Sequence, residues 1–478
     1  MKPTLALCLL AGCGLPSAGV GPSASGPAPA ESLWHYDVTL SEDHARLDVQ
    51  LALTGVRPQR VMLGMAEGLP YLDAPVASWG DHTRTLARDG ESFPLDGVGG
   101  DATIRYRVDL ARLVDDRHGN RVGNDVCASP GLFLLRPNFL PDATAASLAL
   151  HVPPGETASV PWPQDAAGTY LLDETAFRWR GFAAFGRMER HEVRAAGATL
   201  DVVLLDRPHA ATWPGIERWI ARAADAVASL YGSFPVPRAQ IVLRPVASND
   251  AVPFGETQRG GGPAVLLLMG DEARDADFAD DWVAVHEFAH LGMPAIPEQD
   301  AWLSEGFITY YQVVLMGRAG YFDERGAWDD MAAGFERGAG QRGGGRTLAE
   351  TSAAMGRTHA YFRVYWGGAA IALLFDAELR RSTAGARSLD DAIREVHRAF
   401  AGHGAEASAA DIVRHLDAWL GRPLFSELSA GPLASKEFPD TAALLARLGV
   451  VRRDGRTSLD DDAPDAASRR AIMAGATR

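Results

Sequence analysis

Two histidines and a glutamate stand close together in the segment 282–291, in the order His286, Glu287 and His290. On a helix of about 3.6 residues per turn, residues four apart lie on one face, so both imidazole rings can reach one ion. Glu287 projects about 100° further round the helix, beside such an ion, where a general base for a zinc-bound water would lie. The spacing therefore predicts a helix that binds zinc and carries its own catalytic base.

The residues around this trio favour a helix. Acidic residues precede it, as suits a helix N-terminus, and Gly292 and Pro294 follow as stop signals. The alternative is that His286, Glu287 and His290 have a purely structural role. The apolar neighbours are Val283, Val285, Phe288, Ala289 and Leu291, and the acidic ones are Asp277, Asp280 and Asp281.

A third ligand is needed, because catalytic zinc takes three protein donors and keeps one position open for water. Fourteen residues separate His290 from Glu305, which stands near the start of a second helical pattern over 302–311. The segment between them contains two prolines and a glycine, which predict a tight turn that folds one helix back on the other. We expect Glu305 to be the third ligand, and the alternative is an exposed glutamate with a structural role.

At these residues the chain resembles the gluzincin peptidases, the thermolysin-like clan with two histidines and one glutamate on zinc. It is most similar to the glycyl aminopeptidase family, with aminopeptidase N-type enzymes as relatives. Their Trp-x-x-Glu-Gly-x-x-x-Tyr pattern is matched by Trp302, Glu305, Gly306 and Tyr310, after a shorter spacing than is usual there. The resemblance covers about 34–450, most clearly 280–391. It implies a metallopeptidase that binds one zinc ion and hydrolyses peptides or proteins.

The resemblance also suggests further site residues. The segment from Tyr365 through Asp391 is similar to one whose tyrosine donates its hydroxyl to the oxyanion, although Gly367 replaces a lysine. A phenol near zinc can stabilise negative charge in this way. Tyr361, one turn earlier, is the alternative, and either ring could instead pack in the core.

Upstream of the zinc motif, Gly255 and Glu256 stand near the place of a family element whose glutamate binds the free amino group of a substrate. The resemblance implies that Gly255 and Glu256 bind substrate. A loop glutamate with no such role is the alternative reading. The choice between an aminopeptidase and an endopeptidase therefore stays open.

The N-terminus resembles a bacterial lipoprotein signal. One positive charge and a short apolar stretch precede Leu-Ala-Gly-Cys, which predicts a signal over 1–13 and lipidation at Cys13. Residues 14–33, rich in Gly, Pro, Ser and Ala, predict a flexible tether. We expect a protein of the cell envelope, anchored by lipid to an outer membrane and exposed to the periplasm or the surface. Cys127 is expected to be a small buried residue.

Composition bounds the remaining possibilities. The chain has 478 residues, 47% hydrophobic and 22% charged, enough for two cores or more. The formal net charge of −15 argues against nucleic acid as a partner. No further segment is long and apolar enough to predict a membrane span, so we expect membrane contact through the lipid anchor only.

The expected fold is α+β and multidomain. Period-two patterns predict an N-terminal β-sandwich-like domain over 34–205, and helical patterns predict a mainly helical, thermolysin-like zinc peptidase domain over 206–450. Residues 451–478 are expected to form a C-terminal tail with a short helix. Within the peptidase domain, 213–231 predicts a helix, 241–245 and 263–268 predict strands, and 338–345 predicts a glycine-rich loop.

The predicted function is a zinc-dependent peptide hydrolase of the aminopeptidase-like kind, in which Glu287 is the general base and Tyr365 stabilises the oxyanion. Thr309, one turn after Glu305, is a candidate for orienting a ligand, with solvent exposure as the alternative. The second hypothesis is a zinc endopeptidase of the same clan. The third is a non-catalytic surface lipoprotein that uses a relic peptidase fold for binding.

Overall fold

The computed structural model describes residues 33–55, 58–138, 145–172, 176, 181–258, 262–400 and 406–475. The predicted signal over 1–13, the lipidation site Cys13 and the tether, apart from its final residue, lie outside these ranges. None of the helices in the described ranges is long and apolar enough to cross a membrane.

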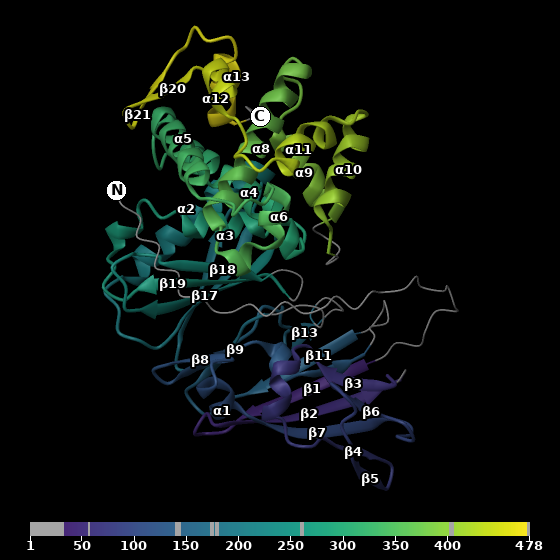
Figure 1. The fold of residues 1–478 in the computed structure, drawn as a ribbon. Coiled ribbons are helices and arrows are strands. Elements are labelled where there is room, and N and C mark those ends of the chain that lie inside the picture. Colours follow the sequence, from purple (N-terminus) through teal and green to yellow (C-terminus); the bar gives the residue numbers. More distant parts are fainter. Residues whose placement is uncertain are drawn as a thin grey trace.

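The N-terminal part is built on a seven-stranded sheet in the order β13-β11-β1-β2-β7-β4-β5 (Figure 1). Side chains of β2 and β7 alternate between buried and more exposed, as the period-two patterns predict. Strand β1 runs parallel to β11 and antiparallel to β2. The bounds are Leu33–Leu40 for β1, Arg46–Thr54 for β2, Val76–Trp79 for β4, His82–Thr85 for β5, Ala102–Asp109 for β7, Ala145–His151 for β11 and Tyr170–Leu172 for β13.

Two smaller sheets and one short helix cover this large sheet. A single apolar core lies between them and includes Trp34, Tyr36 and Phe133. The expected β-sandwich-like N-terminal region is therefore confirmed. The three-stranded sheet has the order β10-β3-β6 and the four-stranded sheet β12-β14-β9-β8. The bounds are Arg60–Leu63 for β3, Ser92–Pro94 for β6, Leu110–Asp115 for α1, Gly119–Val122 for β8, Asp125–Ala128 for β9, Leu135–Pro137 for β10, Thr157–Ser159 for β12 and Ala183–Gly186 for β14.

A five-stranded mixed sheet joins the N-terminal part to the helices, in the order β15-β16-β17-β19-β18. Its first two strands precede residue 205, so this sheet begins inside the range predicted for the N-terminal domain. Strand β18 is an edge strand that pairs only with β19 among the described strands. The bounds are Glu189–Ala195 for β15, Ala198–Leu204 for β16, Arg238–Val246 for β17, Phe254–Gln258 for β18 and Ala264–Gly270 for β19.

The two faces of the five-stranded sheet have different partners. Val265 and Leu267 belong to the core shared with the helices, whereas Leu266 packs with Cys127 and other residues of the N-terminal sheets. Cys127 is buried, and burial raises the pKa of its thiol to about 12, which confirms its expected place in a core. The sheet therefore separates the helical layer from the N-terminal region, as Figure 1 shows.

Helix α2, Trp213–Tyr231, confirms the predicted helix and shows why it forms there. Thr212 accepts a hydrogen bond from the Gly215 amide at the N-terminus, and Gly232 ends the helix with a φ of 94°. The predicted apolar positions are buried against the sheet and α3. These residues are Ile216, Trp219, Ile220, Ala223 and Val227.

The remaining helices form the helical layer, in which α4 and α8 are central. The predicted helices over the zinc motif and over 302–311 are confirmed as α3 and α4. The expected glycine-rich loop begins later than predicted, because α5 continues to Gly340. The bounds are Val283–His290 for α3, Ala301–Arg318 for α4, Glu324–Gly340 for α5, Leu348–Ala353 for α6, Met355–Thr358 for α7, Tyr361–Ser382 for α8, Leu389–Phe400 for α9, Ala409–Leu420 for α10, Leu424–Ala434 for α11 and Ala442–Leu448 for α12.

Helices α4 and α8 approach each other closely because glycines meet at their contact. A Cβ added at Gly368 would overlap the carbonyl oxygen of Trp302, and one added at Gly306 would overlap the backbone of Gly368. Glycine is costly inside a helix, by about 0.5–1 kcal/mol relative to alanine, so its presence at both positions reflects the close approach. The contact brings Glu305, next to Gly306, close to the first turns of α8.

The last described segment packs back on the helical layer. It forms a hairpin of β20, Val450–Arg453, and β21, Arg456–Leu459, followed by α13, Ala466–Ala474. Arg318 at the end of α4 donates to the carbonyl oxygen of Ile472 through Nε at 3.0 Å and Nη2 at 2.7 Å. The helix predicted in this tail is present, but the hairpin was not predicted.

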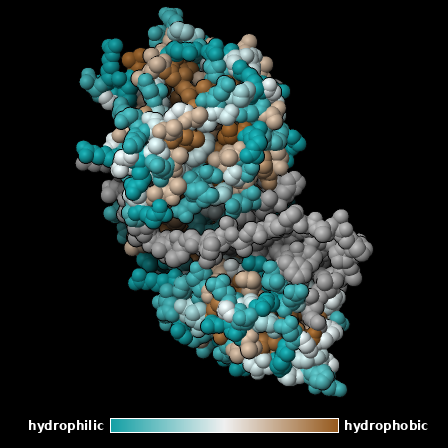
Figure 2. Space-filling view, turned by 45° about the vertical axis from the view of Figure 1, so that its right-hand side comes forward, coloured by the Kyte–Doolittle hydropathy of each residue, from teal (hydrophilic) through white to brown (hydrophobic). Residues whose placement is uncertain are grey.

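The molecular surface is mostly hydrophilic on the face seen in Figure 2, with apolar side chains in small groups on both parts of the molecule. Four large hydrophobic side chains of the described residues are exposed. Three of them, Phe254, Trp282 and Phe362, lie on or beside β18, α3 and α8. The exposed aromatic rings are therefore concentrated on the elements that surround the zinc motif.

We expect Gly368→Ala to lower the melting temperature, because overpacking costs about 1–3 kcal/mol and the obstacle here is backbone. Thermal unfolding followed by circular dichroism would measure the change. Gly340→Ala at the end of α5 is the control, since nothing outside its chain neighbours lies within 4 Å of its added Cβ, and it should stabilise by up to about 1 kcal/mol. A Gly368→Ala variant as stable as the wild type would contradict the close contact.

Candidate metal centre

Helix α3 is held at its N-terminus by Asp281. Its carboxylate accepts hydrogen bonds from the amides of Val283 at 2.9 Å and Ala284 at 3.0 Å. The indole Nε1 of Trp219 on α2 also donates to it, at 2.7 Å. Asp281 therefore satisfies amides that the helix itself leaves unpaired and ties α3 to α2. The acidic residue that the sequence placed before the helix is a buried cap.

The structure brings His286, His290 and Glu305 together as a compact set of metal donors. The Nε2 atoms of the two histidines are 3.2 Å apart, and Oε2 of Glu305 lies 3.4 Å from His286 Nε2 and 3.3 Å from His290 Nε2. Tetrahedral zinc with bonds of about 2.0–2.1 Å requires ligand atoms roughly 3.3 Å apart. All three separations agree with that value, so the residues fit a zinc ion.

The charge state of Glu305 suits a ligand. Burial alone would raise the pKa of its carboxyl, but His290 and His286 outweigh burial and hold that pKa well below its usual range. Glu305 is therefore a carboxylate across the neutral pH range, which is the form that binds a cation. For His286, burial lowers the pKa of the imidazole, whereas Glu305 and Glu287 raise it. The net result is a pKa above the usual value.

A residue that the sequence analysis missed orients the first histidine. Oε1 of Gln312 lies 3.1 Å from Nδ1 of His286, so an Nδ1–H donated to this amide leaves Nε2 free to face the cluster. Gln312 lies seven residues after Glu305 on α4, two helical turns away and on the same face. The i+7 spacing could have suggested it. Thr309 is 3% exposed, which excludes the alternative of a solvent-exposed residue.

The predicted base, Glu287, contacts the edge strand β18. Thr257 Oγ1 lies 2.7 Å from Glu287 Oε2 and 2.7 Å from the Glu287 carbonyl oxygen. Gly255 lies against the same side chain, since a Cβ added there would be 2.5 Å from Cγ of Glu287. Of the two residues predicted to bind substrate, Gly255 is therefore at the site. Thr257 gave no signal in the sequence.

Glu256 is not brought to the cluster. Its cross-strand partner is Leu266, so it shares the face of the sheet that packs on the N-terminal part, whereas Gly255 and Thr257 face α3. Gln258, on the same face as Glu256, donates a hydrogen bond to its carboxylate. Strand alternation explains the difference, because neighbouring side chains point to opposite faces.

Tyr365 lies beside the cluster, as predicted. Its ring is nearly parallel to that of His286, with 12° between the planes and 6.2 Å between the centroids. Burial and then the charges of Glu305 and Glu287 raise the pKa of Tyr365 well above its usual value, so the phenol keeps its proton and can donate it. The Tyr361 hydroxyl instead lies 3.4 Å from His359 Nδ1. The geometry favours Tyr365 over Tyr361 for the oxyanion.

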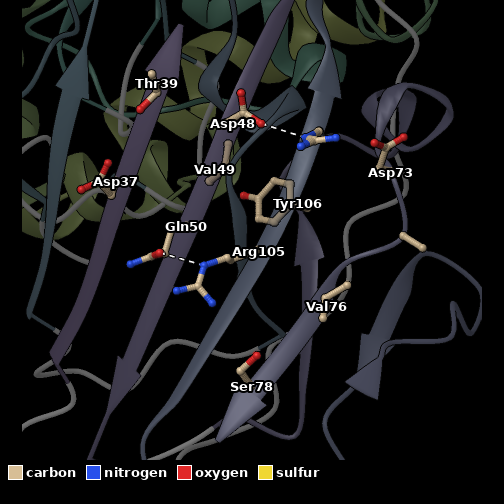
Figure 3. Close-up of a pocket in the computed structure, with 12 residues that line it drawn as sticks. Asp37, Thr39, Asp48, Val49, Gln50, Asp73, Val76, Ser78, Arg105 and Tyr106 are labelled. Atoms are coloured by element: carbon tan, nitrogen blue, oxygen red, sulfur yellow. Dashed lines mark hydrogen bonds and ion pairs between the residues drawn. The ribbon is translucent and has the colours of Figure 1, made fainter. Parts of the chain in front are cut away.

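A separate concavity of about 550 Å³ lies on the seven-stranded sheet and shares no residue with the cluster. Figure 3 shows its polar side chains standing along neighbouring strands. Arg107 Nε donates to Asp48 at 2.9 Å, and Arg105 Nε donates to Gln50 at 3.0 Å. These cross-strand pairs hold both arginines that line the concavity, and Asp37 and Asp73 are further acidic residues in its lining.

Comparison with known proteins identifies the fold. No protein family model and no curated protein sequence matches the chain. An aminopeptidase N family protein from Idiomarina loihiensis superposes with a TM-score of 0.69 at 19% identity, over 90% of this chain and 82% of that one. An M1 zinc metallopeptidase from Deinococcus radiodurans superposes with a TM-score of 0.55 at 16% identity, over 86% and 95%. A mutant of an M1 zinc metallopeptidase from the same organism, bound to a Tyr-Ser-Ala substrate, gives 0.56 at 16% identity, over 86% and 96%. The predicted gluzincin-like fold is therefore confirmed.

We expect the cap of the metal helix to make stability depend on pH. Burial raises the pKa of Asp281 to about 6 from 3.8, so between these values the folded chain keeps a proton that the unfolded chain loses. Stability contributed by this group therefore falls as pH rises from about 4 to about 6, by about 3 kcal/mol at most. Asp281→Asn does not titrate, and urea unfolding at pH 4 and pH 7 should show a smaller fall than in the wild type. The exposed neighbour Asp280→Asn is the control, and equal pH dependence in all three proteins would contradict the expectation.

Proposed function

We propose that this protein is a zinc-dependent peptide hydrolase. The observation that carries the proposal is the set of three separations between His286 Nε2, His290 Nε2 and Glu305 Oε2, each close to the edge of a zinc tetrahedron. A glutamate that is not part of this set, Glu287, lies next to it on α3, and a protonated phenol, that of Tyr365, lies beside His286. Metal-assisted hydrolysis requires three kinds of group, which are donors for the metal ion, a general base, and a hydrogen-bond donor for the oxyanion.

The roles of the residues follow from these positions. His286, His290 and Glu305 would hold one zinc ion, which when bound lowers the pKa of water and polarises a carbonyl group. Glu287 takes the proton of the attacking water and passes it to the leaving amine. Tyr365 donates its hydroxyl to the oxygen that becomes negative, and Gln312 keeps the ring of His286 in place.

Peptides are the substrates that the fold favours. The neighbours in fold are zinc metallopeptidases, one of them bound to a Tyr-Ser-Ala substrate. The exposed ring of Trp282 near the cluster provides apolar surface for substrate side chains. The Trp282 ring stands edge-on to His286 at a centroid distance of 6.0 Å, so a side chain next to the cleaved bond would contact it.

An aminopeptidase is the first reading, supported by the neighbour from the aminopeptidase N family and by the sequence resemblance. One observation favours an endopeptidase instead. The carboxylate expected to bind the free amino group, that of Glu256, lies on the face of β18 away from α3. A relic fold used only for binding is less well supported, because three donors, base and phenol are all present.

The proposed place of action is the bacterial cell envelope, with the chain anchored through a lipid on Cys13. The basis is the Leu-Ala-Gly-Cys sequence and the apolar stretch before it. The polar tether over 14–33 would separate the peptidase from the membrane surface. Metabolic labelling with a radioactive fatty acid, compared between the wild type and Cys13→Ser, would test this.

The proposed function predicts that the full chain binds one zinc ion and hydrolyses amino-acid amides or short peptides. We expect His290→Ala to lose both zinc and activity, because one donor of three is removed. Glu287→Gln should keep zinc and lose activity by about 10²–10⁴-fold. Elemental analysis and amide hydrolysis on the same samples would measure this, with His82→Ala, exposed on β5, as control. A wild type that takes up no zinc would overturn the proposal.

A second measurement separates the two kinds of peptidase. The aminopeptidase reading predicts hydrolysis of peptides with a free amino terminus and none of the same peptides after acetylation, followed by mass spectrometry. Internal cleavage of acetylated peptides would establish the endopeptidase. We expect Glu256→Ala to leave KM within about twofold for both, because its carboxylate lies on the other face of β18. A rise in KM only for unblocked peptides would restore Glu256 as an amine ligand.

A further inference from the structure

The side chain of Glu287 lies directly on the backbone of strand β18. A Cβ added at Gly255 would be 2.5 Å from Cγ of Glu287 and 2.8 Å from Cγ1 of Val283, so no larger residue fits there without displacing the base. Gly255 does not have a positive φ, and its lack of a side chain is therefore explained by this close approach alone. The backbone of the edge strand β18 therefore packs directly against the methylene groups of Glu287.

Thr257 adds a polar contact between β18 and Glu287. It stands two residues after Gly255 on β18, on the same face, and its hydroxyl oxygen lies 2.7 Å from Oε2 of the Glu287 carboxylate. The same oxygen lies 2.7 Å from the carbonyl oxygen of Glu287. A link between β18 and α3 would need only the contact to the carbonyl. The hydroxyl carries one proton, so it donates to one of these two oxygens at a time. Donation to the carboxylate connects Thr257 to the group that performs the chemistry.

These two contacts restrict the direction of the carboxylate. A glutamate with free rotamers points its carboxyl group in several directions, whereas the contact with Gly255 limits the stem of Glu287 and the hydroxyl of Thr257 holds Oε2. Oε1 is then the oxygen left to accept a proton from water. A base held in place before the substrate binds does not have to be ordered during the reaction, and a misplacement of about 1 Å can cost about 100-fold in rate.

We propose that Thr257 is a positioning residue for the reaction, which fixes the carboxylate of Glu287 through its hydroxyl, and that Gly255 is the backbone support that this arrangement requires. The inference rests on the proposed function, in which Glu287 is the general base. It assigns to β18 a part in catalysis as well as in the sheet. Substrate binding through zinc does not depend on this contact.

The test compares Thr257→Val, which keeps the shape of the side chain and removes the hydroxyl, with Thr257→Ser, which keeps the hydroxyl. Zinc content, kcat and KM would be measured on the full chain loaded with zinc, using the amide or peptide that the wild type hydrolyses best. We expect Thr257→Val to lower kcat by about 10- to 100-fold, with KM changed by less than about threefold and zinc retained. Thr257→Ser should recover most of the lost kcat. Thr83→Val on the exposed strand β5 controls for removal of a threonine hydroxyl elsewhere.

The outcomes are distinct. Wild-type kcat in Thr257→Val, or an equal loss in Val and Ser variants, would overturn the positioning role while leaving the proposed function intact. A rise in KM alone would also overturn it, because it would mark a substrate contact. A zinc-loaded wild type without hydrolytic activity would overturn the proposed function and this inference with it. Should Thr257→Val fail to fold, Gly255→Ala tests the same support, with loss of kcat and retained zinc expected and an unchanged kcat contradicting it.

Discussion

The close crossing of α4 and α8 is the constraint on which the candidate site depends. Two helices with ordinary side chains at the contact would stand further apart, but Gly306 and Gly368 let one backbone rest on the other. Glu305 precedes one glycine and Tyr365 precedes the other by three residues. The glycines therefore set the distance between the backbones that carry Glu305 and Tyr365, because the two helices meet at backbone atoms and not at side chains.

Around this crossing, charged and polar groups hold the site from three directions. Asp281 fixes the start of α3, Gln312 fixes the ring of His286, and the Tyr310 hydroxyl donates to Asp376 of α8 at 2.7 Å. Asp376 in turn accepts from the amide of Leu389 at the start of α9. Asp281, Gln312, Tyr310 and Asp376 thus each have a hydrogen-bond partner on another element, which offsets the cost of burying their polar groups.

The sequence predicted what local spacing determines. The positions of His286, Glu287 and His290 follow from the period of one helix, and α2 and α4 follow from their apolar patterns. Contacts between segments far apart in the chain could not be predicted from this spacing. Thr257 and Glu256 are neighbours in the chain and only the strand register decides which faces the base. Likewise, the sequences of β15 and β16 indicate strands but not which sheet these strands join, so the start of the five-stranded sheet could not be predicted.

The contact between Arg318 and Ile472 has a consequence for biosynthesis. Helix α4 carries Glu305, yet the far end of that helix is anchored by a carbonyl group from α13, more than 150 positions later in the chain. Contacts of such sequence separation form late and slowly. During translation the helix that carries Glu305 would therefore leave the ribosome long before its anchor, and the nascent chain must be kept from aggregation during that interval.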